Sequence, residues 1–218
     1  MADRVLVVAA HPDDETLGCG ATIAKHCAAG DEVAVITMAD GVSSRTSMRT
    51  DIALRQSACR KACEILGTGD LTMGDRSDNS MDEEALINIV RTVEYHIERI
   101  KPAIVYTNWR GDLNVDHQVT HDAVRVATRP QPGCVVRRLL YFEVPCSTAW
   151  GGTFQPDHYV DVKDTMSTKL KACLCYESEL RPPPHPRSLA GISILAMWRG
   201  NQVGLHSAEA FKVGRWIA

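Results

Sequence analysis

The chain has 218 residues, of which 44% are hydrophobic and 23% are charged, as in an ordinary soluble globular protein. This length predicts one domain over residues 1–218 with a sizeable core, and it is too short for two comfortable domains. The formal net charge of −3 offers no basic excess to neutralise phosphates, so we expect no nucleic-acid partner.

The N-terminal apolar run Val5–Ala10 lacks a cationic lead and a small-residue cleavage site, so it predicts a buried strand rather than a secretion signal. Apolar runs elsewhere fall short of the roughly 20 residues that a membrane span needs. We therefore expect no stable membrane insertion and a cytoplasmic location. The eight cysteines include no CxxC pair, which favours free, mostly buried thiols over disulfides or structural zinc.

Short apolar runs alternate with longer amphipathic segments, which is typical of βαβ units. In chain order we expect strand Val5–Ala10, helix Leu17–Ala29, strand Glu32–Met38, helix Thr50–Leu66, strand Asp70–Met73, helix Asp82–Ile100, strand Ala103–Thr107 and helix His117–Thr128. Beyond Pro130 we expect strands Arg138–Val144 and His158–Val162, then helices Lys163–Ser178 and Ser188–Asn201.

This alternation predicts an α/β fold with a Rossmann-like, open and mostly parallel sheet and helices on both faces. Folds of this kind bind ligands at the carboxyl ends of their strands. Two polar segments of the chain follow strands in this way.

The first polar segment runs from His11 to Glu15 as HPDDE, directly after the first strand. Its four ionisable groups are costly to desolvate unless something compensates them, and a divalent cation would do so. Imidazole together with carboxylate suits zinc, or ferrous iron, better than magnesium or calcium. The alternative is a capped helix start with Asp13 or Asp14 at the N-cap, and the segment taken alone favours neither interpretation.

The second polar segment, Gly111–His117, follows the strand Ala103–Thr107. Loops after adjacent parallel strands can meet, so His117 can join His11 and Asp14 in a three-ligand site with one open position. That pattern is typical of catalytic zinc.

The remaining polar groups of the two segments are then candidates for catalysis. Asp13 lies beside the ligands and is not needed as one, so it can take a proton from water activated by the metal. Asn114 is a candidate donor to an oxyanion, and Asp116, next to His117, is a third candidate catalytic group.

The stretch VLVVAAHPDDETLGCGATIAKHCAAGDEVAVITMADG closely resembles the opening of the PIG-L/LmbE-like de-N-acetylases. The resemblance continues through RQSACRKACEILG, SDNSMD, GDLNVDHQVTHDAV and AMWRGNQVGLHSAEAF, and so covers nearly the whole chain. It implies a Rossmann-like sheet, a mononuclear zinc site and small-molecule substrates that are N-acylated amino sugars, including glycolipid, thiol-cofactor and antibiotic precursors. The sequence leaves open whether the substrate is free, lipid-linked or nucleotide-linked.

The resemblance also implies roles for particular residues. The family's zinc ligands match His11, Asp14 and His117, and its general base matches Asp13. Arg55 falls where many members carry an arginine implicated in substrate binding.

Two positions depart from the family pattern. Several members have a histidine where this chain has Asn114, and asparagine can donate to an oxyanion but cannot supply a proton. The acid role then moves to Asp13 or to a histidine from elsewhere, or the enzyme is tuned differently. His185, in the turn Pro184-His185-Pro186, is a candidate replacement, although a structural or exposed histidine is the more ordinary interpretation. Ala58 stands where many members have a glutamate, which leaves the local substrate contacts open.

Two further residues are candidates for substrate binding. Asp40 follows the second expected strand, and Trp109 follows the strand Ala103–Thr107 and could stack on a sugar. Loop tryptophans equally often form hydrophobic lids or oligomer contacts, and an exposed tail over Trp198–Trp216 could supply the interface of a homo-oligomer.

The principal hypothesis is therefore metal-dependent removal of an N-acyl group, in the first place acetyl. The alternative is a non-catalytic, Rossmann-like nucleotide- or ligand-binding protein. Against it, the first strand leads into HPDDETLGCG rather than GxGxxG, and acidic groups there would repel a pyrophosphate. Asp13 also argues against it, because a purely structural metal site has no use for a spare carboxylate.

Overall fold

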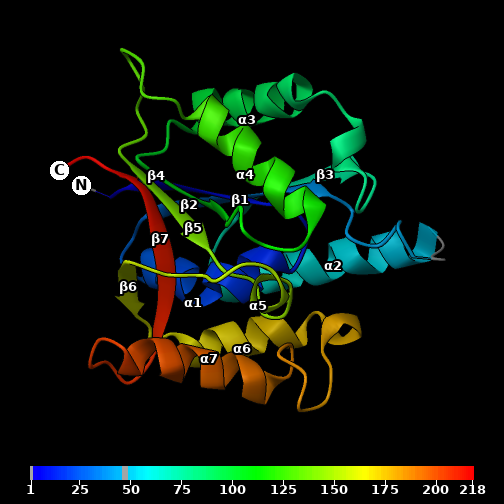
Figure 1. Cartoon of the computed structure of the whole chain (residues 1–218), viewed down its shortest axis with the longest axis vertical. Coiled ribbons are helices and arrows are strands. Elements are labelled where there is room, and N and C mark those ends of the chain that lie inside the picture. The colour runs from blue at the N-terminus through cyan, green and yellow to red at the C-terminus, as the bar shows by residue number, and fades with distance from the viewer. Residues whose placement is uncertain (1, 46–48) are drawn as a thin grey trace.

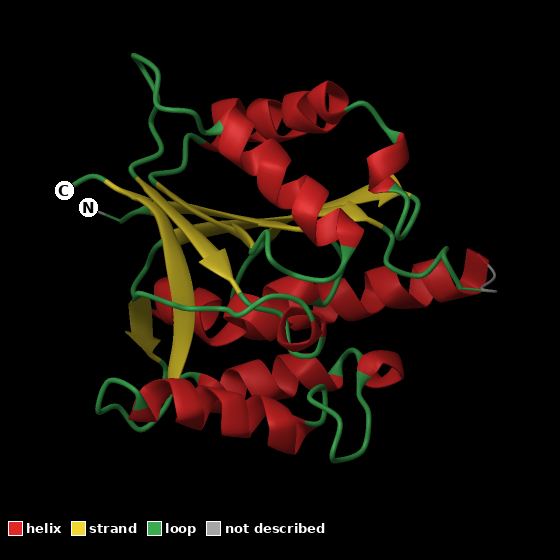
Figure 2. Ribbon diagram, viewed as in Figure 1, coloured by secondary structure: helices red, strands yellow, loops and turns green. Residues whose placement is uncertain are grey.

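The computed structural model describes residues 2–45 and 49–218. Its strands form one seven-stranded sheet in the order β3-β2-β1-β4-β5-β7-β6 (Figures 1 and 2). β1 to β5 pair in parallel, whereas β7 runs antiparallel between β5 and β6. The strands are β1 Arg4–Ala9, β2 Glu32–Ala39, β3 Asp70–Arg76, β4 Ile104–Asn108, β5 Arg138–Phe142, β6 His158–Asp161 and β7 Ala208–Trp216.

Helices cover both faces of this sheet (Figure 1). α3 and α4 lie on one face, and α1 and α2 lie on the other, where α6 packs against them from the side away from the sheet. The α-helices are α1 Asp14–Ala28, α2 Arg49–Leu66, α3 Leu86–Ile100, α4 Val115–Ala127, α5 Ser147–Trp150, α6 Met166–Leu174 and α7 Leu189–Asn201; the 3₁₀ turns are η1 Met81–Glu83 and η2 Glu177–Glu179.

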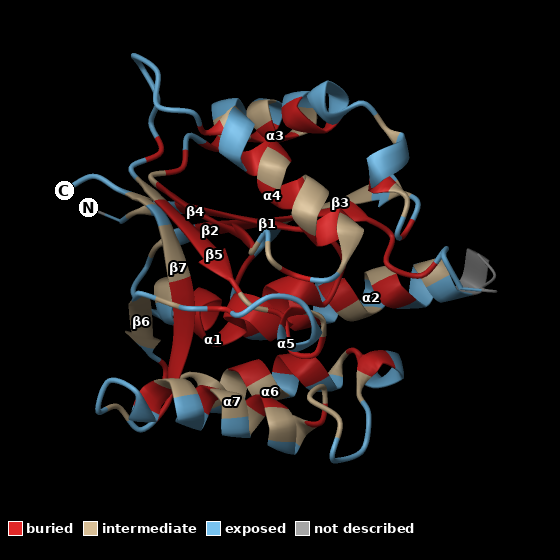
Figure 3. Ribbon diagram, viewed as in Figure 1, coloured by how far each residue is buried: buried red, intermediate tan, exposed pale blue. Residues whose placement is uncertain are grey.

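The central strand β1 has a core on each side. Val5, Val7 and Ala9 belong to the core under α1, α2 and α6, whereas Leu6 and Val8 belong to the core under α3 and α4. All five side chains are fully buried, and β1 is largely in the colour of buried residues in Figure 3. The continuous apolar run of β1 therefore reflects a parallel strand that is covered by helices on both faces, as expected.

The predicted α/β class is confirmed, with a mostly parallel sheet and helices on both faces. Most boundaries differ from the expected ones by a few residues, and two helices differ most: α3 begins at Leu86, after a 3₁₀ turn over Met81–Glu83, and α6 spans only Met166–Leu174 of the expected Lys163–Ser178. All eight cysteines are free, and five of them are buried. None of the helices in the described ranges combines the length and the apolar composition that spanning a bilayer requires.

The expectation of an exposed tail over Trp198–Trp216 is wrong for its last part. Residues Ala208–Trp216 form β7 inside the sheet, and Phe211 is fully buried. The strand was missed because Glu209 and Lys212 interrupt its apolar pattern, and Glu209 is in fact a buried residue.

Glu209 is buried because it repairs a break in α1. The helix has a non-helical residue at Cys19, with φ −142° and ψ 22°. The carboxylate of Glu209 accepts hydrogen bonds from the amide N–H groups of Ala21 (3.1 Å) and Thr22 (2.7 Å), which follow the break. The strand β7 thus satisfies backbone donors that a continuous helix would satisfy itself.

Lys169 of α6 completes this repair. Its ammonium group donates to the backbone carbonyl of Leu17 at 2.7 Å and to Glu209 at 2.5 Å, and all of these groups are buried. A buried ion pair with further hydrogen bonds loses much stability when one partner alone is removed, because the other charge remains unpaired.

We therefore expect Lys169→Met to lower the free energy of unfolding by roughly 3–5 kcal/mol. The double variant Lys169→Met/Glu209→Gln should recover part of this loss, because glutamine can accept a hydrogen bond without a buried charge. Urea unfolding followed by circular dichroism measures both. Equal midpoints for the single variant and the unmodified chain would contradict this account of α1.

Candidate active site

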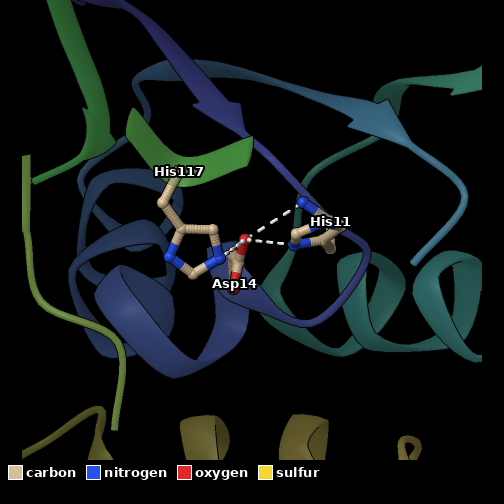
Figure 4. Close-up of side chains that lie close together, drawn as sticks. All are labelled: His11, Asp14 and His117. Atoms are coloured by element: carbon tan, nitrogen blue, oxygen red, sulfur yellow. Dashed lines mark hydrogen bonds and ion pairs between the residues drawn. The ribbon is translucent and has the colours of Figure 1, made fainter. Parts of the chain in front are cut away.

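Three side chains converge where two adjacent strands end. His11 follows β1, Asp14 opens α1, and His117 lies in the first turn of α4, which follows β4. β1 and β4 are neighbours in the sheet, so their carboxyl ends bring the two histidines together. One potential ligand atom from each of the three residues lies within 4.8 Å of the others. Figure 4 shows the two imidazoles on either side of the Asp14 carboxylate.

Asp14 is the centre of this group. Its Oδ2 atom lies 3.1 Å from His117 Nε2 and 3.4 Å from His11 Nδ1, and it accepts the backbone N–H of His11 at 3.0 Å. Its Oδ1 atom is buried and has no hydrogen-bond partner among the described residues. A buried carboxylate oxygen without a partner is costly, so the three residues fit a divalent cation.

A carboxylate also lies behind each imidazole. His11 Nε2 is 2.9 Å from Asp116 Oδ2 and 3.1 Å from Asp78 Oδ1, while His117 Nδ1 is 3.1 Å from Asp112 Oδ1. In metal sites such carboxylates fix the orientation of the ring and increase the basicity of the ligating nitrogen. The arrangement leaves His11 Nδ1 and His117 Nε2 facing Asp14.

The pKa values of these groups report an excess of negative charge. Burial alone would lower the pKa of His117, but Asp14 and Asp112 raise it to about 9. Burial likewise opposes a charged His11, yet Asp116, Asp14 and Asp78 raise its pKa well above the usual value. The site is therefore built to hold positive charge, which a cation can supply.

Asp116, a candidate catalytic residue, lies behind His11. It is fully buried, and its carboxylate accepts the backbone N–H groups of Asn79 (2.7 Å) and Met81 (3.0 Å) in addition to facing His11 Nε2. Through these contacts Asp116 orients the imidazole and ties the loop after β3 to the site.

Asn114 is the N-cap of α4. Its Oδ1 atom accepts the backbone N–H groups of Asp116 (2.8 Å) and His117 (3.3 Å), and its Nδ2 atom donates to Asn79 Oδ1 at 2.9 Å. Asparagine is among the preferred N-cap residues, so the position has a structural reason besides any catalytic one. The capping bonds direct Oδ1 toward the backbone of α4, so the amide nitrogen is on the side away from the helix.

Asp13 lies beside the three converging residues in an unusual conformation. Its φ is 130°, which a residue other than glycine rarely adopts and which costs on the order of 1–3 kcal/mol. Its Oδ2 atom lies 3.2 Å from Arg187 Nη1 and 3.4 Å from Arg55 Nη1. Burial raises the pKa of Asp13, and the two guanidinium groups oppose that rise.

Arg55, a candidate substrate-binding residue, is only 4% exposed. Its guanidinium donates to the backbone carbonyl of Pro12 at 2.7 Å and to the carboxylate of Glu179. Glu179 also accepts hydrogen bonds from Arg45 and from Arg187. Among the described residues, the Arg55 guanidinium thus contacts the carbonyl of Pro12 and the carboxylates of Asp13 and Glu179.

Two further candidates, Asp40 and Trp109, make side-chain contacts with other residues. Asp40 accepts the N–H groups of Val42 and Ser43, each at 2.8 Å, in the turn after β2. The ring of Trp109 packs edge-on against Phe154 with ring centres 5.2 Å apart. Within the described ranges no hydrogen bond, ion pair or ring contact joins either residue to His11, Asp14 or His117.

His185 also makes its contacts elsewhere. Its Nδ1 atom accepts the N–H of Arg187 at 3.0 Å, and its ring lies edge-on to Trp150, with the ring centres 5.8 Å apart. The side chain from this segment that does reach Asp13 belongs to Arg187, two residues later.

The sequence reasoning missed four residues of the site. Two had a local signal, since Asp78 lies in SDNSMD and Asp112 in GDLNVDH, both segments that resemble the family. The other two, Glu179 and Arg187, lie in a region without a recognisable motif and approach Asp13 only in the folded chain.

The fold and the site define a Rossmann-like α/β protein with a candidate mononuclear metal centre. Residues 6–128, more than half of the chain, match the family described as GlcNAc-PI de-N-acetylase, PIG-L. The chain is 30% identical over 177 residues to the uncharacterized deacetylase YaiS of Escherichia coli K12, an alignment that covers 78% of this chain and 88% of the relative. The chain therefore belongs to the PIG-L family of de-N-acetylases.

Solved structures show the same fold. N,N'-diacetylchitobiose deacetylase from Pyrococcus horikoshii superposes with a TM-score of 0.81 at 20% identity, covering 97% of this chain and 84% of that one. GalB, the 4-carboxy-2-hydroxymuconate hydratase from Pseudomonas putida KT2440, superposes with a TM-score of 0.79 at 19% identity, covering 99% of this chain and 98% of that one. At these identities the likeness concerns the fold alone, and it includes proteins with different reactions.

We expect Asp116→Asn to weaken the binding of a divalent metal about 10- to 100-fold, because the carboxylate behind His11 is lost. Asp122→Asn is the matched control, since Asp122 lies on the same helix and pairs with Arg110 at the surface. Titration with zinc against a competing chelator measures both affinities. Equal affinities in the two variants would contradict the role of Asp116.

We expect Asn114→Ala to lower the free energy of unfolding by about 1 kcal/mol through the lost N-cap, whereas Asn114→Ser should remain close to the unmodified chain. Chemical denaturation in the presence of a chelator separates this effect from metal binding. A serine variant as unstable as the alanine variant would show that capping is not what Asn114 contributes.

Proposed function

We propose that this protein is a zinc-dependent hydrolase that removes an N-acyl group, in the first place acetyl, from an amino sugar or its lipid- or nucleotide-linked conjugate. The observation that carries the proposal is the convergence of His11, Asp14 and His117 around a buried carboxylate oxygen without a partner, with Asp13 beside them. Membership of the PIG-L family supports the reaction class.

We assign the metal to His11 Nδ1, His117 Nε2 and the carboxylate of Asp14. Two imidazoles and one carboxylate suit zinc, and ferrous iron is the other ion that this donor set accepts. When bound, the cation supplies a Lewis acid that polarises the amide carbonyl and lowers the pKa of water.

We assign proton transfer to Asp13. Among the described residues, Arg55 and Arg187 both contact the Oδ2 atom of its carboxylate, so we assign Oδ1 to the reaction. As general base Asp13 takes a proton from the attacking water, and it then returns a proton to the leaving amine. Arg55 and Arg187 hold the carboxylate in place and offset the cost of burying its charge.

We assign stabilisation of the oxyanion to Asn114. Its Nδ2 atom carries two hydrogens, of which one is donated to Asn79 Oδ1. The second is the donor that we assign to the oxygen of the amide as negative charge develops on it. This division of labour explains how asparagine serves at a position where a histidine would also act as an acid.

The substrate class rests on what related proteins are described as acting on. The family's description names GlcNAc-PI, and the similar Pyrococcus structure is a deacetylase of N,N'-diacetylchitobiose. Both names contain an N-acetylglucosamine unit, so we propose an acetylated glucosamine as the reacting group. A panel of such sugars, free, lipid-linked and nucleotide-linked, incubated with the zinc-loaded protein and assayed for acetate, tests this. No acetate from any member would overturn the proposed activity, even if zinc binds.

Two substitutions separate proton transfer from metal binding. We expect Asp13→Asn to keep its zinc and to lose about 10²- to 10⁴-fold in kcat, which is the usual contribution of a general base. His117→Ala should lose zinc and activity together, because a ligand is removed. Elemental analysis and acetate release on the purified variants measure both quantities. Equal zinc content and equal rate in the two variants would contradict the assignment.

A further inference from the structure

The peptide bond between Pro12 and Asp13 is held at both of its polar ends. The N–H of Asp13 donates to Glu15 Oε2 at 2.9 Å, and the carbonyl oxygen of Pro12 accepts from Arg55 Nη1 at 2.7 Å. A peptide group is planar, so fixing both ends fixes its rotation. The residue that follows it, Asp13, has φ 130° and ψ −28°.

The N–H side of this arrangement is rigid. Glu15 is fully buried, and its other oxygen, Oε1, accepts hydrogen bonds from Thr16 Oγ1 and from Tyr176 Oη, each at 2.6 Å. These donors hold the carboxylate so that Oε2 faces the backbone of Asp13. Glu15 has no part in the reaction as assigned above, although it belongs to the HPDDE segment.

The carbonyl side is equally rigid. Arg55 is buried, and Glu179 binds its Nη2 atom, so that Nη1 faces both Pro12 and the carboxylate of Asp13. The planar guanidinium suits this task, because its donors have fixed directions.

The residues that hold Glu15 and Arg55 in place belong to one short stretch of chain. Tyr176, just before η2, binds Glu15, and Glu179, the last residue of η2, binds Arg55. This stretch lies beyond residues 6–128, the part of the chain that matches the family.

We propose that Glu15 and Arg55 are positioning residues that clamp the Pro12–Asp13 peptide and thereby direct the carboxylate of Asp13, and that Arg55 does this in place of contacting the substrate. A strained backbone persists at a functional residue only where its surroundings over-determine it, and the two hydrogen bonds meet that requirement. The kinetic consequence rests on the proposed function, whereas the clamp itself does not.

A split of kcat from KM tests the role of Arg55. We expect Arg55→Ala to lose about 100-fold or more in kcat, with KM changed by less than about threefold and zinc content retained, because a misdirected base slows the reaction without removing a substrate contact. Arg60→Ala, an exposed position on the same helix, is the control and should behave like the unmodified enzyme. A KM raised more than about tenfold with kcat nearly unchanged would assign Arg55 to the substrate and overturn the proposal.

Two gentler variants guard against a failure to fold. Tyr176→Phe removes one donor to Glu15 without altering the HPDDE segment, and Glu15→Gln keeps the size of the side chain. We expect both variants to have a lower kcat and to retain their zinc content and KM. The decrease in kcat should be larger for Glu15→Gln than for Tyr176→Phe. A loss of zinc from either variant, or an unchanged kcat in both, would overturn the clamp as a positioning device.

A measurement without substrate tests the clamp independently. Glycine tolerates φ 130° and alanine does not, so Asp13→Gly should melt about 2–8 °C above Asp13→Ala. Combining each with Arg55→Ala should reduce this difference in Tm by at least half, because an unclamped peptide can relax. Glycine also lowers Tm through its greater conformational entropy in the unfolded chain. This effect is the same with and without Arg55→Ala, so it does not alter the comparison of the two differences in Tm.

The outcomes of the two kinds of experiment are distinguishable. A chain that releases no acetate from any sugar would contradict the proposed function, while the four melting temperatures still test the clamp. A difference between the glycine and alanine variants that is the same in both backgrounds would overturn the clamp, whatever the activity of the enzyme.

Discussion

The constraint on which the rest of the structure depends is the burial of several carboxylates at one end of the sheet. The aspartates concerned, each no more than 5% exposed in its side chain, are Asp13, Asp14, Asp78, Asp112 and Asp116. Like charges this close destabilise a folded chain unless cations or hydrogen-bond donors compensate them. The protein meets the demand with two imidazoles, two guanidinium groups, backbone N–H groups and a place for a metal.

These compensating groups are distributed unevenly between Asp13 and Asp14. The imidazoles of His11 and His117 face Asp14, whereas the guanidinium groups of Arg55 and Arg187 face Asp13. Two aspartates that are adjacent in sequence thus have different partners. In the function that we propose, this difference lets Asp14 serve as a metal ligand while Asp13 transfers protons.

A feature of the fold or the site could be predicted from the sequence where residues close together in the chain determine it. The parallel strands follow from apolar runs, and the grouping of His11, Asp14 and His117 follows from polar segments placed after neighbouring strands. The guanidinium contacts do not follow from any local pattern, because Arg55 and Glu179 are 124 residues apart. Strand β7 was hidden for a related reason, since Glu209 resembles a surface residue until its bonds to α1, 188 and 187 residues away, are known.

The C-terminal part of the chain therefore determines how the N-terminal motif works. Glu209 and Lys169 satisfy the backbone of α1 where that helix breaks, and α1 carries Asp14 in its first turn. Tyr176 and Glu179 hold the side chains that fix the peptide before Asp13. In the function that we propose, the direction of the Asp13 carboxylate therefore depends on Arg55, outside the HPDDE segment, as well as on Glu15 within it. The HPDDE segment supplies two of the three side chains that converge at the candidate metal centre, and the distant stretch around η2 holds the two residues that fix the backbone at Asp13.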